Sequence, residues 1–293
     1  MTLPKISILG EVLFDSFAEG VQVLGGAPFN VAWHLQALKL PSLFMSCVGQ
    51  DETGDEVLSA MRGWGMQTEG LQRDPIYPTG RVEISLTEGE PHYSILDHQA
   101  YDHINFTALP QPKTCWLYHG SLALRHESAI EDFLQWRQIY NGKVFIDINL
   151  RAPWWSHQQL EKLIKGADWL KLNQEELRLL NPVGANTLDQ LKRLMASYDL
   201  SAILLTQGAE GAQLCTADGE IYKIKPQQQS EIIDSVGAGD AFAAICLLGL
   251  IAHWPYQLML ERAQVFASAL LSQRGAIVRQ PEFYRSFIRQ WQI

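Results

Sequence analysis

Near its C-terminal end the chain contains the stretch Ile233-Asp234-Ser235-Val236-Gly237-Ala238-Gly239-Asp240-Ala241-Phe242-Ala243-Ala244. Its first part is rich in small residues, and glycine in particular lets the backbone take dihedral angles that other residues avoid. An apolar run from Ala241 to Leu250 follows directly. That run is long enough for a buried helix and too short to cross a membrane. The stretch therefore predicts a loop that opens into a buried helix.

The start of this predicted helix has the features of an anion site. Gly237, Ala238 and Gly239 would leave backbone N–H groups unpaired at the positive end of the helix dipole, which attracts anions. Asp240 in the same turn has two interpretations. It either caps the helix, which is the commoner role of an acid there, or takes a proton from a hydroxyl that attacks a bound phosphate. The glycines, the helix and the acid together favour the second.

The composition describes an acidic chain with a large core. Of its 293 residues 47% are hydrophobic and 19% are charged, which excludes a disordered protein. The net charge of −9 argues against nucleic-acid and anionic-membrane partners. The four cysteines are scattered without a C-x-x-C pair, so we expect neither a zinc site nor a disulfide framework. Three of them lie in apolar runs and, with no secretory pattern at the N-terminus, predict a cytoplasmic location.

Short apolar runs alternate with amphipathic segments along most of the chain. This pattern is typical of strand–helix units that form a mostly parallel sheet covered by helices on both faces. The expected strands are 5–9, 43–48, 115–119, 144–148, 169–172 and 202–205, with a hairpin at 213–216 and 220–224. The expected helices are 31–38, 55–62, 127–140, 160–166, 173–180, 188–198, 241–250, 256–272 and 282–292.

Residues 77–95 depart from this alternation. Val82, Ile84 and Leu86 alternate with polar residues, which predicts a β-hairpin. A hairpin inserted among strand–helix units is either an ordinary edge hairpin or a lid over a site. Because its apolar face needs a cover, we expect a homodimer formed through this hairpin.

Polar residues follow several of the expected strands. The two-residue period places Asp147, Asn149 and Arg151 on one side of a strand end, where sheets of this class bind ligands. Asp15 is expected near the carboxyl end of the first strand, as a loop acid or as an acceptor for a ligand hydroxyl. Asn30 follows the glycine pair of residues 25 and 26, and either favours a helix start or contacts a polar ligand.

Several widespread catalytic motifs are absent from the sequence. It contains neither G-x-x-x-x-G-K-[ST] nor G-x-G-x-x-G, and neither G-x-S-x-G nor H-E-x-x-H. Glycines and acids at strand ends remain, together with one helix N-terminus suited to an anion. This set suits phosphoryl transfer, which needs charge stabilisation, a positioned acceptor hydroxyl and magnesium rather than a covalent nucleophile.

With these motifs in hand, the chain resembles the ribokinase-like (pfkB) family of carbohydrate kinases. The matching elements occur in the family's order and span essentially the whole chain. They are Gly10–Asp15, Gly25–Asn30, Asp147–Arg151, Asn173–Glu176, Thr206–Gly211 and Asp234–Asp240. The resemblance implies a three-layer αβα fold, formed by a single domain over residues 1–293, with a small β lid from about 12–24 and 77–100.

The resemblance also implies roles for individual residues. Asp240 would be the catalytic base, with the amides of Gly237, Ala238 and Gly239 as the anion hole. The implied sugar contacts are Asp15, Gly26, Asn30 and Arg151. The implied nucleotide contacts are Asn173, Thr206, Gly208 and Gly211, while Glu176 would serve magnesium and Asp234 a monovalent cation. Asn173 and Glu176 also match a capping box at a helix start, and both interpretations can hold together.

The implied cofactors are ATP and Mg²⁺, with K⁺ used by many members. The stretch from Asp147 to Trp155 and the hairpin residues 78–81 are most similar to the fructokinase branch, so fructose is the first candidate substrate. A 2-keto-3-deoxygluconate kinase, a nucleoside kinase and a non-catalytic sugar-binding regulator remain alternatives, because a shared fold does not fix the substrate. Two residues depart from the family pattern: Ile245 stands where a glycine is common, and Gln264 where an asparagine often lies near the adenine.

Overall fold

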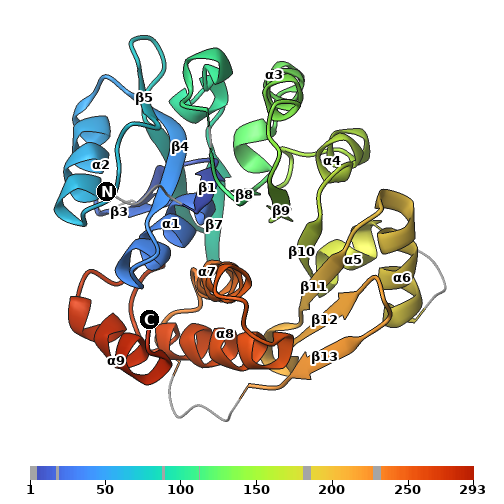
Figure 1. Ribbon diagram of the computed structural model, residues 1–293. Helices are drawn as coiled ribbons and strands as arrows, with labels where there is room; N and C mark the ends of the chain where they lie inside the picture. The colour runs from blue at the N-terminus through green and yellow to red at the C-terminus, as the bar shows by residue number, and fades with distance from the viewer. Residues whose placement is uncertain (1–4, 18–19, 88–89, 112, 181–185, 227–231) are drawn as a thin grey trace.

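The computed structural model describes residues 5–17, 20–87, 90–111, 113–180, 186–226 and 232–293. Its larger sheet is formed by β1 (Ile6–Leu9), β4 (Ser42–Gly49), β5 (Leu71–Asp74), β8 (Trp116–His119), β9 (Lys143–Asp147), β10 (Trp169–Asn173), β11 (Ala202–Thr206), β12 (Ala212–Thr216) and β13 (Ile221–Ile224). The spatial order is β13-β12-β11-β10-β9-β8-β1-β4-β5 (Figure 1). All neighbours from β11 to β5 are parallel, and β12 and β13 form the predicted antiparallel hairpin at one edge.

Helices cover both faces of this sheet. One face packs against α1 (Ala27–Ala37), α2 (Glu52–Gly63), α7 (Ala238–Ile251), α8 (Tyr256–Leu270) and α9 (Pro281–Trp291). The other face packs against α3 (Glu127–Arg137), α4 (His157–Ile164), α5 (Gln174–Leu180) and α6 (Thr187–Tyr198). In Figure 1, α7 and α8 lie on the lower side of the sheet and α3 and α4 on the upper side. The three-layer α/β fold predicted from the sequence is therefore confirmed.

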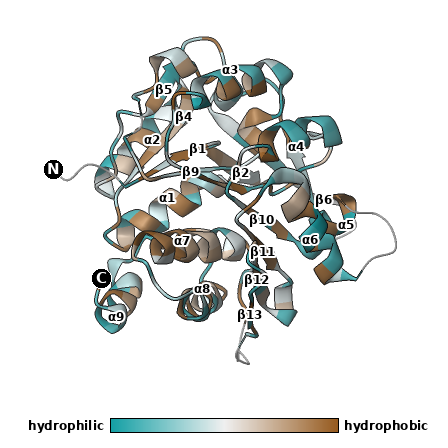
Figure 2. Cartoon of the chain, turned by 45° about the vertical axis from the view of Figure 1, so that its right-hand side comes forward, coloured by the Kyte–Doolittle hydropathy of each residue, from teal (hydrophilic) through white to brown (hydrophobic). Residues whose placement is uncertain are grey.

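The helix predicted from the opening stretch is the innermost one. Residues 241–249 of α7 are all buried, since the helix lies between the sheet, α1 and α8. Figure 2 shows its predominantly apolar surface, as expected for a helix enclosed on all sides. Ile245, where the resemblance suggested a glycine, is fully buried in the same core. Its side chain is accommodated without interrupting the helix.

A second, four-stranded sheet stands apart from the first. It is formed by β2 (Leu13–Phe17), β3 (Gln22–Gly25), β6 (Gly80–Thr87) and β7 (Glu90–Ile95), in the order β3-β2-β6-β7. The expected hairpin of residues 77–95 is formed by β6 and β7. Val82 and Ile84 are buried within this chain, so the expectation that their face needs a partner's cover is wrong for these two residues.

The strand order reverses at β1, near the middle of the larger sheet, and such a reversal leaves a crevice outside the carboxyl ends of the strands. The chain leaves β1 for β4 on one side and later returns to β8 on the other side of β1. Helix α1 covers one face beside this point, and α3 packs into the core of the opposite face. Ligands of open α/β sheets bind outside the carboxyl ends of the strands at such a reversal. The fold thus places the ends of β1, β8, β9 and β10 around one site.

Arg125 ties the four-stranded sheet to the body of the protein. Its guanidinium donates to both carboxylate oxygens of Asp102, at 2.7 and 2.6 Å, and to the carbonyl of Leu96 just after β7, at 2.6 Å. It also lies over the ring of Trp154, 4.1 Å from the centroid. The side chains of Arg125 and Asp102 are both fully buried.

In the described part of the chain no helix is both long and apolar enough to span a membrane.

Replacing Arg125 with methionine is expected to destabilise the fold strongly. The change leaves the carboxylate of Asp102 buried without its partner, which costs about 3–5 kcal/mol in other proteins. Urea unfolding measures the loss. The matched control is Arg81→Met, which breaks the exposed pair of Arg81 and Glu83 and should cost under about 1 kcal/mol. Equal losses in the two variants would contradict an anchoring role for Arg125.

Candidate active site

The N-terminus of α7 is shaped by a glycine that no other residue could replace. Gly237 precedes the helix with φ of 79°, in the left-handed region. A Cβ on Gly237 would lie 2.5 Å from the Cα of Ala276, far inside contact distance. Conformation and space therefore both require glycine here. This requirement holds the helix start against the loop that contains Ala276.

The amides of this turn lie at the helix start, where the sequence places them. The first regular helical bond runs from Ala241 N to the Gly237 carbonyl at 2.9 Å. The Ala238 amide makes a long 3.5 Å contact to the Ser235 carbonyl. The amides of Gly239 and Asp240 precede the regular helical bonding, where N–H groups are free to bind an external anion.

Asp240 lies in this first turn and contacts the N-terminal half of the chain. Asn30 donates its amide Nδ2 to the Asp240 carboxylate at 2.8 Å, across 210 residues of sequence. Burial raises the pKa of Asp240 to about 6, the Asn30 hydrogen bond lowers it, and the negative charge of Asp147 adds to the rise. A carboxyl with a raised pKa next to an anion site is suited to general-base chemistry near neutral pH.

A buried ion pair beside α7 was missed by the sequence analysis. Lys171 in β10 donates to the carboxylate of Asp147 at 2.6 Å, and the Tyr118 hydroxyl donates to the same oxygen at 3.1 Å. Although burial alone would lower it, the pKa of Lys171 is raised by Asp147 and, further away, by Asp240. Its Nζ lies 3.7 Å from where a Cβ on Gly239 would be. A lysine inside the apolar strand 169–172 was the available signal, because a buried lysine needs a charged partner.

The predicted sugar contacts converge on one side of Asp240. A Cβ on Gly25 would lie 3.8 Å from Asp15 Oδ2 and 3.9 Å from Asn30 Oδ1, so the two polar side chains flank this glycine. Gly26 is the N-cap of α1 with φ of 111°. Burial raises the pKa of Asp15 to about 6 and the charge of Arg151 lowers it, which places Arg151 near this group. The expectation that Asp15 ends the first strand is wrong, since it lies inside β2 of the smaller sheet.

The two-residue period that predicted one shared side for Asp147, Asn149 and Arg151 does not continue past Asp147. Strand β9 ends at Asp147, so the two-residue period stops there. Asn149 then takes a positive φ of 38°, which turns the chain. Asp147 is buried and paired with Lys171, whereas Arg151 is exposed, and the charges of both Asp147 and Arg151 act on the pKa of Asp240. The chain therefore brings both charges near Asp240 by a turn after β9 and not by a regular strand.

Asn173 and Glu176 form the predicted capping box at the start of α5. Asn173 Oδ1 accepts the amides of Glu175 and Glu176, both at 2.9 Å, and Glu176 Oε2 accepts the amide of Asn173 at 2.7 Å. Glu176 Oε1 also accepts the amide of Leu150, at 2.7 Å. The Glu176 side chain is buried, and burial raises its pKa. The box thus fixes a carboxylate at the end of β10.

Thr206, Gly208 and Gly211 form a turn at the end of the neighbouring strand. Thr206 is the last residue of β11 and pairs in register with Asn173 of β10. Gly208 and Gly211 have φ of 55° and 96°, and the Gln207 amide closes the turn on the Gly211 carbonyl at 2.8 Å. The structure therefore brings this turn beside the capping box.

Asp234 lies next to the loop of residues 274–276. Its Oδ2 accepts the Gly275 amide at 2.9 Å, and its Oδ1 accepts the Val236 amide at 3.0 Å. Each carboxylate oxygen retains a further lone pair. The contact fixes the loop before α7 against the loop after α8.

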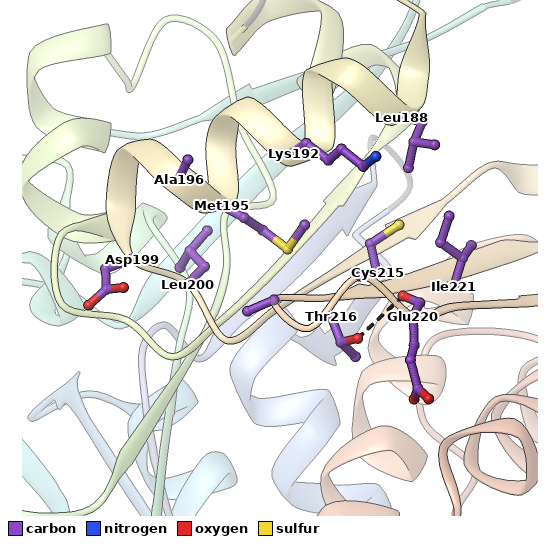
Figure 3. Close-up of a pocket in the computed structure, with 12 residues that line it drawn as sticks. Leu188, Lys192, Met195, Ala196, Asp199, Leu200, Cys215, Thr216, Glu220 and Ile221 are labelled. Carbon is purple, nitrogen blue, oxygen red and sulfur yellow. Dashed lines mark hydrogen bonds between the residues drawn. The ribbon is translucent and has the colours of Figure 1, made fainter.

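A cavity of about 320 Å³ lies elsewhere, between α6 and the β12–β13 hairpin. Figure 3 shows Lys192 and Met195 of α6 on one side of it and Cys215 of β12 on the other. None of the predicted site residues lines this cavity. Its walls include Leu200, just before β11, so it lies toward the amino end of that strand and away from the crevice.

The model of the pfkB family carbohydrate kinase matches residues 14–282. The chain belongs to this family. It is 31% identical to the fructokinase of Escherichia coli, over 94% of this chain and 96% of that protein. It is 26% identical to the aminoimidazole riboside kinase of Salmonella typhimurium, over 94% and 92%. The structure of fructokinase with bound ATP from Xylella fastidiosa superposes with a TM-score of 0.86 at 22% identity, covering 99% of this chain and 100% of that one.

As a pfkB carbohydrate kinase, the protein is a phosphotransferase that acts on a sugar hydroxyl. The crevice between β1 and α7 has the parts that this reaction needs. It combines a helix N-terminus, a carboxyl with raised pKa and a buried lysine. The transferring group needs charge stabilisation and the acceptor hydroxyl needs a base.

Replacing Asp240 with asparagine is expected to lower kcat by about 10²–10⁴, the usual range for loss of a general base. Nucleotide binding should persist, because the amide removes only the proton acceptor. In the parent the pKa of Asp240 is about 6, so kcat should fall as the pH drops below that value and the base becomes protonated. Steady-state rates from pH 5 to 8 measure both effects.

The same substitution should not destabilise the fold at pH 8. A carboxyl whose pKa is raised on folding favours the folded state when protonated and disfavours it when ionised. The side-chain amide that replaces the carboxylate carries no charge, and its oxygen can still accept from Asn30. Asp132→Asn on the exposed surface of α3 is the control and should keep parent kinetics. Near-normal turnover of Asp240→Asn would remove Asp240 from the role of base.

Proposed function

We propose that this carbohydrate kinase transfers the γ-phosphate of ATP to a hydroxyl of a monosaccharide, with fructose as the first candidate. One observation carries the assignment of the reacting centre: Asp240 occupies the first turn of α7 and is held there by Asn30, 2.8 Å away. A base and an anion site thus share one turn. The similarity to the fructokinase of Escherichia coli, at 31% identity, supports fructose.

On the acceptor side, Asp240 takes the proton of the attacking hydroxyl in this proposal. Asp15, Asn30 and Arg151 bind the other sugar hydroxyls, and Gly26 lets the backbone approach them. Support comes from the orphaned Oδ1 of Asn30, a buried acceptor with no hydrogen-bond partner in the described structure. Buried acceptors in folded proteins are normally paired, and sugar hydroxyls are hydrogen-bond donors.

On the donor side, the amides of Gly237, Ala238 and Gly239 stabilise the phosphoryl group as an anion hole. The nucleotide is contacted by Asn173, Thr206, Gly208 and Gly211. Lys171, which lies beside the first turn of α7, balances the charge of the phosphate. Support comes from their placement, because the turn of residues 206–211 and the capping box end two adjacent strands. Backbone donors and a lysine are what a phosphate group requires.

The residues present fit magnesium and a monovalent cation. Glu176 offers carboxylate oxygens, the ligand type that Mg²⁺ prefers, and both already bind amides, so contact through metal-bound waters suits this ion. When bound, Mg²⁺ neutralises charge on the phosphates. Asp234 and the loop of residues 274–276 offer oxygens for K⁺. The cytoplasmic location stays a prediction.

The four-stranded sheet is proposed as the lid, comprising about residues 12–24 and 77–100 of a single kinase domain. Lid closure excludes water from the transfer and limits wasteful ATP hydrolysis. The position of Asp15 supports this role, because this predicted sugar contact lies in β2 of the four-stranded sheet. Arg125 fixes the chain just after β7, where the sheet joins the body.

A panel of sugars and nucleosides in a coupled ADP assay tests the substrate. We expect fructose to give the highest kcat/KM, and the rate without any sugar to be far lower. Preference for 2-keto-3-deoxygluconate or for a nucleoside would replace fructose as the substrate. ATP hydrolysis without sugar at the sugar-dependent rate would contradict the lid. Sugar binding in calorimetry with no phosphorylation would favour a sugar-binding regulator.

A homodimer through the lid is proposed on different residues from those the sequence indicated. Phe17, Val21, Val23 and Tyr93 are exposed apolar side chains on three strands or their ends. Light scattering at micromolar concentration is expected to give twice the mass of one chain, and Phe17→Ser with Tyr93→Ser should shift it to the monomer. Ile139→Ser, at an exposed site beyond α3, is the control. A monomeric parent would refute the dimer.

A further inference from the structure

One buried carboxyl in the crevice has no role so far. Glu11 lies two residues beyond the end of β1 and is 3% exposed. Its main chain is pressed against the N-cap of α1, since a Cβ on Gly26 would lie 2.7 Å from the Glu11 carbonyl oxygen. Backbone hydrogen bonds from Glu11 itself and from Ala27 favour the ionised carboxyl. The side chain is therefore held at the start of α1.

One oxygen of this carboxyl, Oε2, is buried and has no hydrogen-bond partner in the described structure. A carboxyl oxygen removed from water without a partner is costly, so such an atom requires an explanation. Asn30 Oδ1, on the sugar side of the site, is orphaned in the same way. Asp147 Oδ1 is a third such atom, and three unpaired acceptors at one crevice point to a ligand that supplies donors.

The space beside Oε2 is kept free by a glycine. A Cβ on Gly120, which follows β8, would lie 4.0 Å from Glu11 Oε2, 3.7 Å from the Asp147 carbonyl oxygen and 3.7 Å from Pro28 Cγ. These are ordinary contact distances, and the φ of Gly120 is not in the left-handed region. Neither a clash nor backbone strain therefore requires glycine at this position. A group the size of a methyl or a hydroxyl therefore fits beside Oε2.

The position and the charges both place this space in the acceptor site. Glu11 and Gly120 follow neighbouring strands, β1 and β8, at the reversal of strand order where ligands bind. Burial raises the pKa of Glu11 to about 7, the charge of Asp240 adds to the rise, and the charge of Arg151 opposes it. A carboxyl of this kind can accept or donate a hydrogen bond near neutral pH.

We propose that the space between Glu11, Gly120 and Asp147 is a subsite for one hydroxyl group of the acceptor sugar, with Glu11 Oε2 as its hydrogen-bond partner. The inference rests on the proposed acceptor site and adds a specificity-determining residue to it. A site that holds a buried polar group for one hydroxyl rejects analogues that lack this hydroxyl.

Two substitutions in the full-length chain test the subsite from opposite sides. Glu11→Gln keeps the shape and removes the carboxyl, and it should raise the KM for the sugar about 10-fold, as expected for one hydrogen bond of this kind. Gly120→Ala places a methyl group in the subsite at tolerated distances, so it should raise the same KM while leaving the Tm unchanged. In both variants the KM for ATP should stay within about twofold of the parent value. Glu131→Gln, on the exposed surface of α3, is the control.

Singly deoxygenated analogues of the preferred sugar identify the hydroxyl. For one analogue the parent should lose about as much kcat/KM as Glu11→Gln loses on the intact sugar, and Glu11→Gln should add no further loss. Such non-additivity shows that the residue and the hydroxyl share one interaction.

Three results would overturn the subsite: variants that lower the Tm but leave the sugar KM unchanged, equal effects on the KM for ATP and sugar, or additive losses for every analogue. If the parent phosphorylates no sugar in the panel, the proposed acceptor site itself fails, and the subsite fails with it.

Discussion

The hydrogen bond between Asn30 and Asp240 joins the two halves of this protein at its proposed reacting centre. Asn30 lies in the first turn of α1 and Asp240 in the first turn of α7, so the bond brings two helix N-termini together. Each helix start depends on a glycine with positive φ, Gly26 or Gly237, that packs directly on neighbouring backbone. Because both helices pack against the same face of the sheet, a shift of either one would separate the carboxylate from the amide.

Around this contact the crevice concentrates buried charge. Burial raises the pKa of Asp240 and of Glu11, while Lys171 stays charged on Asp147. Ionised carboxylates with raised pKa values destabilise the folded state above those values. The large apolar cores on both sides of the sheet offset this cost. The arrangement is typical of enzymes, in which the site is less stable than its scaffold.

Much of the fold could be predicted because its signals are local. The strand–helix alternation, the 213–224 hairpin, the capping box of Asn173 and Glu176 and the buried helix after Gly239 all appear where short-range patterns indicated them. The errors also have local causes. Extending a two-residue period through residue 151 failed, because Asn149 with its φ of 38° turns the chain. The prediction that Asp15 ends the first strand failed, because the sequence does not show that the chain leaves the larger sheet after β1.

The sequence by itself determined which residues are candidates for the chemistry. Glycines before an apolar helix and acids after short strands can each be recognised from a short stretch of sequence. Only the tertiary structure decided which of them meet. Asn30 and Asp240 are 210 residues apart, and Lys171 pairs with Asp147 across neighbouring strands. It also decided that Val82 and Ile84 are covered within the chain, and that Glu11 faces the space left by Gly120. Such contacts follow from strand order and burial, which depend on the packing of the whole chain and not on any one stretch of it.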